Sequence, residues 1–136
     1  MVEARARRVP VRVLLVDDNA PIERLITLLL TERGYAVSTA ATGAEALQAA
    51  ADERPSLVLL DLELPDIDGF EVLRRIRADR RLAATPVVAF TAMALPSDVD
   101  RIQAAGFDGR IVKPIDPESF LDDVARYLGD GVHSKE

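Results

Sequence analysis

A short apolar run that ends in a carboxylate constrains the fold of this chain more than any other feature of its sequence. Residues Leu57 to Leu60 are all apolar, Asp61 follows them directly, and residues 62–69 contain Pro, Asp and Gly. A continuous apolar run bounded by turn residues is typical of a strand buried on both faces, as in a parallel sheet. Open α/β folds place their chemistry at the edge where such strands end. We therefore expect Asp61 at that edge, although an Asp after a strand more often only begins a turn.

Strand-like and helix-like segments alternate along the rest of the chain. Apolar runs predict further strands at residues 11–16, 36–40, 86–90 and 111–112. Apolar residues at helical spacing predict helices over about 20–33, 43–52, 70–76, 97–105 and 117–128. Five strands, each followed by a helix, favour an α/β fold: a doubly wound, five-stranded parallel sheet with helices on both faces.

Capping residues mark where several of these helices begin. Asn19 and Asp116 each precede a helix with proline in its first turn. Thr42 precedes the second helix, and Glu45 stands three residues later, which is the spacing of a capping box. These residues predict helices that begin soon after the strands end.

Composition and charge exclude several classes of site. The chain has a net charge of −6, which argues against a surface built for nucleic acid or for an anionic membrane. It has no cysteine, so a disulfide framework and a thiolate metal site are excluded. One histidine, His133, cannot supply a zinc enzyme with several histidine ligands. With 136 residues, 49% of them hydrophobic, the chain can bury the core of one domain.

The two ends of the chain differ from its middle. We expect a flexible basic lead over residues 1–10, one folded domain over 11–128 and a flexible tail over 129–136. The arginines of the lead resemble those of a transit peptide, although Glu3 and the lack of serine argue against one. No apolar run is long enough to span a membrane. We therefore expect a cytoplasmic protein.

Polar residues follow four of the predicted strands. Asp17 and Asp18 follow the first, Asp61 the third, Thr91 the fourth and Lys113 the fifth. Right-handed crossovers bring the carboxyl ends of parallel strands to one edge, so these side chains are expected to share a crevice. Each residue alone also suits a helix cap, a turn or a solvated surface charge. Four strand ends that suit one reaction are much less common by chance.

The charges of this set favour a metal ion. Three aspartates and one lysine leave a net charge of −2, and like charges in a partly dry crevice repel one another unless they are compensated. Oxygen ligands select a hard divalent ion such as Mg²⁺. Together with a hydroxyl and an ammonium group, such an ion suits phosphoryl transfer, which depends on positioning and charge neutralisation.

The ordered set of motifs resembles the receiver domain of two-component response regulators. It consists of Asp17-Asp18-Asn19, the strand ending in Asp61, Leu64-Pro65-Asp66-Ile67-Asp68-Gly69, Thr91-Ala92 and Lys113-Pro114. The match covers roughly residues 11–128 and is most similar to single-domain receivers of the DivK type. The resemblance implies a CheY-like, flavodoxin-like fold with strand order 2-1-3-4-5. No segment for a DNA-binding output follows residue 128, so signalling through protein contacts is expected.

The resemblance also implies what the acidic residues do. Asp61 would accept a phosphoryl group from a phosphohistidine on a sensor histidine kinase or a histidine phosphotransfer protein. Asp18 and Asp61 would bind Mg²⁺ directly, and Asp17 would bind it directly or through water. The backbone carbonyl of Glu63 would complete the protein ligands.

Further roles follow for the last two strand ends. Lys113 would pair with the phosphoryl oxygens, and its bond to Pro114 would be cis. Thr91 would move its hydroxyl onto the phosphoryl group. The surface that changes on activation and contacts a downstream protein is expected to include Met93, Arg110 and Pro114. The protein is expected to be a monomer or a weak dimer.

Arg110 departs from the pattern of the family. Receivers of this kind usually carry Tyr or Phe three residues before the lysine, and the ring rotates inward on activation. Arginine is always charged and is costly to bury without a partner. One hypothesis is that the aromatic switch is absent and that Arg110 contacts a partner or forms a salt bridge at the surface. The alternative is a solvated arginine with no role.

Two other functions remain alternatives to the phosphoacceptor. An aspartate-nucleophile phosphatase of the haloacid-dehalogenase kind uses similar groups, but it needs an Asp where Glu63 stands, a late acidic pair and a cap domain. A pseudo-receiver would keep the fold as a binding module without the chemistry. The phosphoacceptor itself would be a switch and not an enzyme with external turnover, although it assists its own phosphorylation and hydrolysis.

Overall fold

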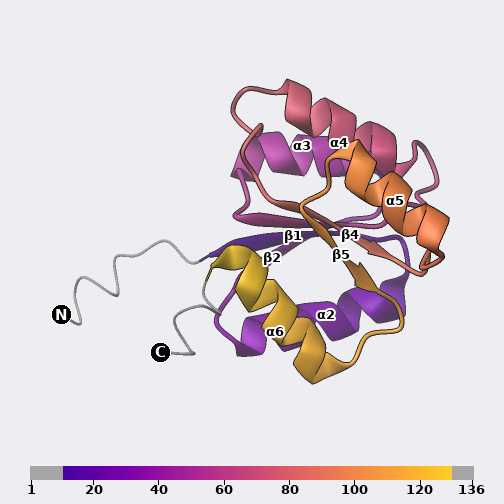
Figure 1. The fold of residues 1–136 in the computed structure, drawn as a ribbon. Helices are drawn as coiled ribbons and strands as arrows, with labels where there is room; N and C mark the ends of the chain where they lie inside the picture. The colour runs from indigo at the N-terminus through magenta and orange to yellow at the C-terminus, as the bar shows by residue number, and fades with distance from the viewer. Residues whose placement is uncertain (1–10, 130–136) are drawn as a thin grey trace.

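The computed structural model describes residues 11–129, which form a parallel sheet between two layers of helices (Figure 1). The strands are β1 (Arg12–Val16), β2 (Ala36–Ala40), β3 (Leu57–Leu60), β4 (Val87–Thr91) and β5 (Gly109–Val112). The helices are α2 (Ala20–Glu32), α3 (Gly43–Glu53), α4 (Gly69–Ala78), α5 (Pro96–Ala105) and α6 (Pro117–Leu128). The predictions of a flexible lead and tail fall, except for Gly129, outside the described residues.

The sheet has the predicted topology. Its five strands are all parallel and lie in the order β2-β1-β3-β4-β5. Helices α3, α4 and α5 cover one face and α2 and α6 cover the other, as Figure 1 shows. The order reverses at β1, because the chain first adds a strand on one side and then continues on the other. In open α/β sheets, ligands bind at such a reversal, outside the carboxyl ends of the strands.

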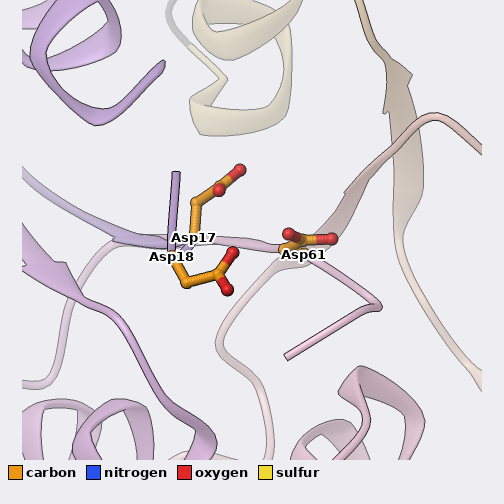
Figure 2. A group of neighbouring side chains, drawn as sticks. All are labelled: Asp17, Asp18 and Asp61. Atoms are coloured by element: carbon orange, nitrogen blue, oxygen red, sulfur yellow. The ribbon is translucent and has the colours of Figure 1, made fainter. Parts of the chain in front are cut away.

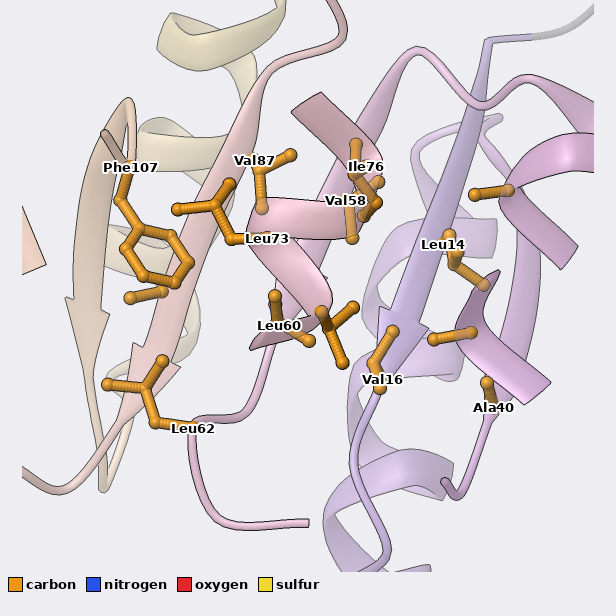
Figure 3. Packing of buried hydrophobic residues seen from close by; sticks show 14 of the residues in the cluster. Leu14, Val16, Ala40, Val58, Leu60, Leu62, Leu73, Ile76, Val87 and Phe107 are labelled. Atoms are coloured by element: carbon orange, nitrogen blue, oxygen red, sulfur yellow. The ribbon is translucent and has the colours of Figure 1, made fainter. Parts of the chain in front are cut away.

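Strand β3 lies at the centre of the hydrophobic core, as the apolar run predicts. All four of its residues are buried. Leu57 and Leu59 pack towards α2 and α6, whereas Val58 and Leu60 belong to the cluster on the other face, part of which is shown in Figure 3. A fully buried leucine stabilises a fold by about 1.5–3 kcal/mol relative to an exposed one. The packing on both faces therefore fixes the position of β3 and of Asp61, which follows its last residue.

The predicted caps are present at the helix starts, with one difference. Asn19 Oδ1 accepts a hydrogen bond from the N–H of Ile22 (3.0 Å), and Asp116 and Thr42 cap α6 and α3 in the same way. The capping box predicted for α3 is shifted, because Glu45 accepts from the N–H of Ala41 (2.9 Å) and not from that of Thr42. The long glutamate side chain reaches one residue further back.

Helix α5 is less firmly packed than its spacing of apolar residues indicates. Of Val99, Ile102 and Ala105, only Ile102 is buried, and Ala105 is exposed. Leu95, which precedes the helix, is 67% exposed. A pocket of about 240 Å³ lies between α5 and β5, and Arg110 is part of its lining. Within residues 11–129, every helix falls short of the length and apolar character that a membrane span requires.

Candidate functional site

The backbone of the sheet places the acidic residues at one edge. The N–H of Asp61 donates to the carbonyl of Val16 (2.9 Å), so the ladder between β1 and β3 continues one residue beyond the strands. The N–H of Lys113 donates in the same way to the carbonyl of Thr91 (2.9 Å). Asp17 and Asp18 follow β1 directly. Main-chain hydrogen bonds between neighbouring strands therefore hold Asp61, Thr91 and Lys113.

Three carboxylates meet at this edge. Asp17, Asp18 and Asp61 each offer an oxygen, and these oxygens all lie within 4.8 Å of one another. Figure 2 shows the three side chains close together, with Asp61, which follows the neighbouring strand β3, beside Asp17 and Asp18. Asp17 and Asp61 are buried, with 2% and 6% of their surface exposed, whereas Asp18 is exposed. The exposed side of the group is thus open to a ligand from solution.

Lys113 is the cation of this site. Its Nζ lies 2.7 Å from Asp17 Oδ2 and 3.4 Å from Asp61 Oδ2. The ammonium also lies 4.9 Å from the centre of the Phe90 ring, which favours a cation. Asp17 Oδ1 accepts a hydrogen bond from the N–H of Asn19 (2.8 Å). With one ammonium group for three carboxylates, the side chains keep a formal charge of −2.

Burial raises the pKa of the Asp61 carboxyl above its usual value of 3.8. The largest cause is desolvation, which disfavours the ionised form, and the nearby charge of Asp17 acts in the same direction. The N–H of Glu63, which donates to Asp61 Oδ1 (3.0 Å), and the charge of Lys113 oppose this shift. The ionised Asp61 is therefore incompletely compensated, and additional positive charge would stabilise it.

Thr91 and Met93 lie at the end of β4. Thr91 is buried, and its Oγ1 accepts a hydrogen bond from the N–H of Met93 (3.0 Å). None of the hydrogen bonds among the described residues joins Thr91 to Asp61. Met93 is partly buried and packs against the hydrophobic cluster under α3, α4 and α5. The predicted hydroxyl is thus at the sheet edge, and it bonds to the loop that follows its own strand.

The other predicted residues lie around this centre. The Lys113–Pro114 peptide bond is cis, as the resemblance implies, and Pro114 is exposed. Glu63 is exposed, and its main chain follows Asp61 closely. Arg110 is exposed on β5, an edge strand, and forms no ion pair with any residue in the described range. The salt bridge considered for Arg110 is therefore absent among residues 11–129.

Asp66, which the sequence pattern does not single out, connects the loop after Asp61 to helix α3. Asp66 belongs to the Pro-Asp-Gly stretch and is typical of a turn, but its carboxylate bonds to two backbone amides of α3 (2.7 and 2.9 Å). These partners are more than twenty residues away in the sequence. No local pattern predicts such a contact.

Comparison with known proteins agrees with this geometry. A family model described as the response regulator receiver domain matches residues 13–125. The polar-differentiation response regulator DivK of Brucella anthropi is 37% identical over 121 residues, which cover 89% of this chain and 98% of DivK. DivK of Brucella ovis is 36% identical over 118 residues, or 87% of this chain and 96% of that protein.

Solved structures show the same similarity. The chemotaxis response regulator CheY4 of Vibrio cholerae has a TM-score of 0.83 and 33% identity, over 88% of this chain and 99% of CheY4. The receiver domain of the sensor histidine kinase PA1611 of Pseudomonas aeruginosa has a TM-score of 0.82 and 31% identity, over 89% of this chain and 99% of that domain. That structure holds a magnesium ion in its active site cleft. The family match, the DivK relatives and the CheY-like fold together identify the chain: it belongs to the response regulator receiver family of two-component signalling and is DivK-like.

Proposed function

We propose that Asp61 accepts a phosphoryl group from a histidine kinase or a histidine phosphotransfer protein and that the protein then signals through altered protein contacts. Receiver domains are generally signalling domains and not enzymes, and they interact with such kinases and with downstream targets. The observation that carries the proposal is the site itself, where three carboxylates share one ammonium group. We further propose that the protein works in the cytoplasm, without nucleic acid or membrane, as a monomer or weak dimer.

The donor set fits Mg²⁺. Asp18 and Asp61 would hold the ion directly, Asp17 would hold it directly or through water, and the carbonyl of Glu63 would complete the protein ligands. The oxygens of the three aspartates lie within 4.8 Å of one another, and their charge exceeds that of Lys113. Carboxylate and carbonyl oxygens are the ligands that this hard ion prefers. When bound, the ion would neutralise charge that develops on the transferred phosphoryl oxygens.

The side chains then divide the chemistry among them. A carboxylate oxygen of Asp61 attacks phosphorus, a P–O bond forms as the P–N bond to the donor histidine breaks, and the imidazole leaves. Lys113 Nζ already lies 3.4 Å from Asp61 Oδ2 and is close enough to pair with the new phosphoryl oxygens. Thr91 would exchange its bond to Met93 for one to the phosphoryl group.

The signal would come from the change in charge. Phosphorylation replaces one negative charge by nearly two and adds three acceptor oxygens. Bonds that Thr91 and Lys113 make only in that state would shift an existing equilibrium between two surface arrangements. Met93 follows Thr91, Pro114 follows Lys113 and Arg110 lies on β5, so we propose this region as the surface read by a downstream protein.

Incubation with Mg²⁺ and acetyl phosphate, or with a phosphorylated kinase, tests the proposal. We expect intact-mass spectrometry to show one added phosphoryl group on the wild type, labile as an acyl phosphate is. Asp61→Asn should abolish it, and Asp52→Asn, which removes an exposed carboxylate of α3, should not. Multiple turnover of a small phosphoester would instead indicate a phosphatase, and no modification by any donor would indicate a pseudo-receiver.

A further inference from the structure

The loop that follows Asp61 is anchored at its base. Residues 62–68 connect β3 to α4 and carry Glu63, the proposed carbonyl ligand. The N–H of Gly69 donates to the carbonyl of Leu62 (3.0 Å), which closes the loop. A Cβ on Gly69 would lie 2.7 Å from the carbonyl oxygen of Asp61. The base of the loop therefore packs directly on the main chain of the proposed phosphoacceptor.

Asp66 ties the middle of this loop to a different element. Its carboxylate oxygens accept hydrogen bonds from the N–H groups of Gly43 (2.7 Å) and Ala44 (2.9 Å), the first residues of α3. The next amide, that of Glu45, donates to Thr42 Oγ1 (3.0 Å). Bonds to the amides of Gly43 and Ala44 lower the pKa of Asp66 from 3.8 to about 2, so it is ionised at neutral pH. Its charge also suits the positive end of the helix dipole.

Apolar contacts join the same two segments. The side chain of Ile67 lies against Gly43, and a Cβ at that glycine would overlap with it. Leu64 is partly buried against the hydrophobic cluster on this face of the sheet. These contacts hold the loop close to α3, but apolar packing alone does not fix the direction of a backbone carbonyl. The two hydrogen bonds of Asp66 add directional contacts between the middle of the loop and α3.

We propose that Asp66 is a positioning residue for the phosphorylation site. By fixing the middle of loop 62–68 on α3, it holds the carbonyl of Glu63 in place and thereby strengthens Mg²⁺ binding. This inference rests on the proposed function. Mg²⁺ demands near-octahedral geometry, so a ligand that samples many positions binds it weakly, and supporting hydrogen bonds commonly change metal affinity by about 10–100-fold.

Asp66→Ala and Thr42→Ala form a matched pair for the test. Both remove hydrogen bonds from the start of α3, but only the first releases the loop. We expect isothermal titration calorimetry to show Mg²⁺ binding weakened roughly 10-fold in Asp66→Ala and by less than about two-fold in Thr42→Ala. Asp66→Asn keeps one acceptor oxygen, so its Mg²⁺ affinity should lie between those of the wild type and Asp66→Ala. It also replaces the alanine variant if that variant does not fold.

Hydrogen exchange without Mg²⁺ gives a second measurement of the loop itself. In Asp66→Ala, the amide of Glu63 should exchange faster together with those of Gly43 and Ala44, whereas Thr42→Ala should expose mainly the amide of Glu45. Equal Mg²⁺ affinity in the two variants at a similar loss of Tm would overturn the inference and leave the proposed function intact. A wild type that binds Mg²⁺ but accepts no phosphoryl group would refute the proposed function alone, because the calorimetric comparison still decides the role of Asp66. A wild type that binds no Mg²⁺ would overturn both.

Discussion

The two ends of the parallel sheet differ in their balance of positive and negative side chains. At the carboxyl end, Asp17, Asp18 and Asp61 share the single ammonium group of Lys113. At the other end, Arg77 pairs with Asp108 at 2.7 Å, one charge against one. The first arrangement needs positive charge from outside to be neutral, and the second does not.

Hydrogen bonding shows the same contrast. Arg77 also donates to the carbonyl of Thr85 (2.6 Å), and Asp108 also accepts from the N–H of Val87 (2.8 Å). This network joins the end of α4 to the starts of β4 and β5. Since its groups bond to one another, its contribution is to stability. We infer that the partly buried cluster with excess negative charge is suited to bind a cation, whereas the balanced network at the surface stabilises the fold, and substitutions can test that difference.

The largest expected effect is that of Lys113→Met. It would leave Asp17, whose side chain is fully buried, without its cation. Removing one partner of a buried ion pair costs about 3–5 kcal/mol, and because Lys113 is 17% exposed we expect about 3 kcal/mol without Mg²⁺. Urea unfolding measures this loss. Mg²⁺ should restore more stability to the variant than it adds to the wild type, since the charge of the site has become −3. Equal stability of variant and wild type without Mg²⁺ would contradict the account.

Arg77→Met should have the next largest effect. It removes the ion pair with Asp108 and the hydrogen bonds that the guanidinium donates to backbone carbonyls. A hydrogen bond to a charged group contributes about 1.5–3 kcal/mol when it is buried. Because the guanidinium is 27% exposed, we expect a total loss near 2 kcal/mol. Mg²⁺ should not restore it, and the rate of Asp61 phosphorylation should be unchanged. Arg74→Met, which breaks an exposed pair with Glu71, is the control and should lower stability much less than Arg77→Met does. A response of Arg77→Met to Mg²⁺ would show that the two ends of the sheet are coupled.

Asp61→Asn should stabilise the protein by about 1 kcal/mol at neutral pH without Mg²⁺, or about 4 °C in Tm. Burial raises the pKa of Asp61, so the folded state favours the neutral acid. The wild type is therefore relatively most stable below pH 3.8 and loses stability as the pH rises through the higher folded-state pKa. The amide that replaces the carboxyl does not ionise. Asp61→Asn should therefore become more stable than the wild type as the pH rises through the folded-state pKa of Asp61, and the difference should vanish in acid. Thermal unfolding between pH 3 and 7 measures the difference, and a constant gap would show that ionisation of Asp61 is not its cause.

The sequence predicts much of this structure because its strands are short and strongly patterned. The run Leu57–Leu60 is buried in full, and Asp61 follows it at the sheet edge as expected. The order of strands and the gathering of the acids follow from parallel crossovers and from the resemblance to receivers. What a local pattern does not carry is the identity of distant partners.

Three residues illustrate that limit in physical terms. Asp66 looks like a turn residue, and only the packing of its loop on α3 brings it to the amides of that helix. Arg77 ends an amphipathic helix, and its partner Asp108 lies 31 residues away. Ala105 has helical spacing but is exposed, because α5 rests on the sheet mainly through Ile102. In each case tertiary packing decides the contact, and residue type alone does not.

Arg110→Tyr should have the smallest effect on stability and tests whether the contrast between the ends extends to the signalling surface. Arg110 is exposed and has no ion pair within residues 11–129, so we expect a change within about 0.5 kcal/mol. The neighbouring pocket of about 240 Å³ has room to receive an aromatic ring. If Arg110 contacts the downstream protein, calorimetry should show weaker binding of that partner to the phosphorylated variant, while Arg80→Tyr, a similar change at another exposed site, should not. Unchanged affinity, with the same dependence on phosphorylation, would establish Arg110 as a solvated residue with no part in partner binding.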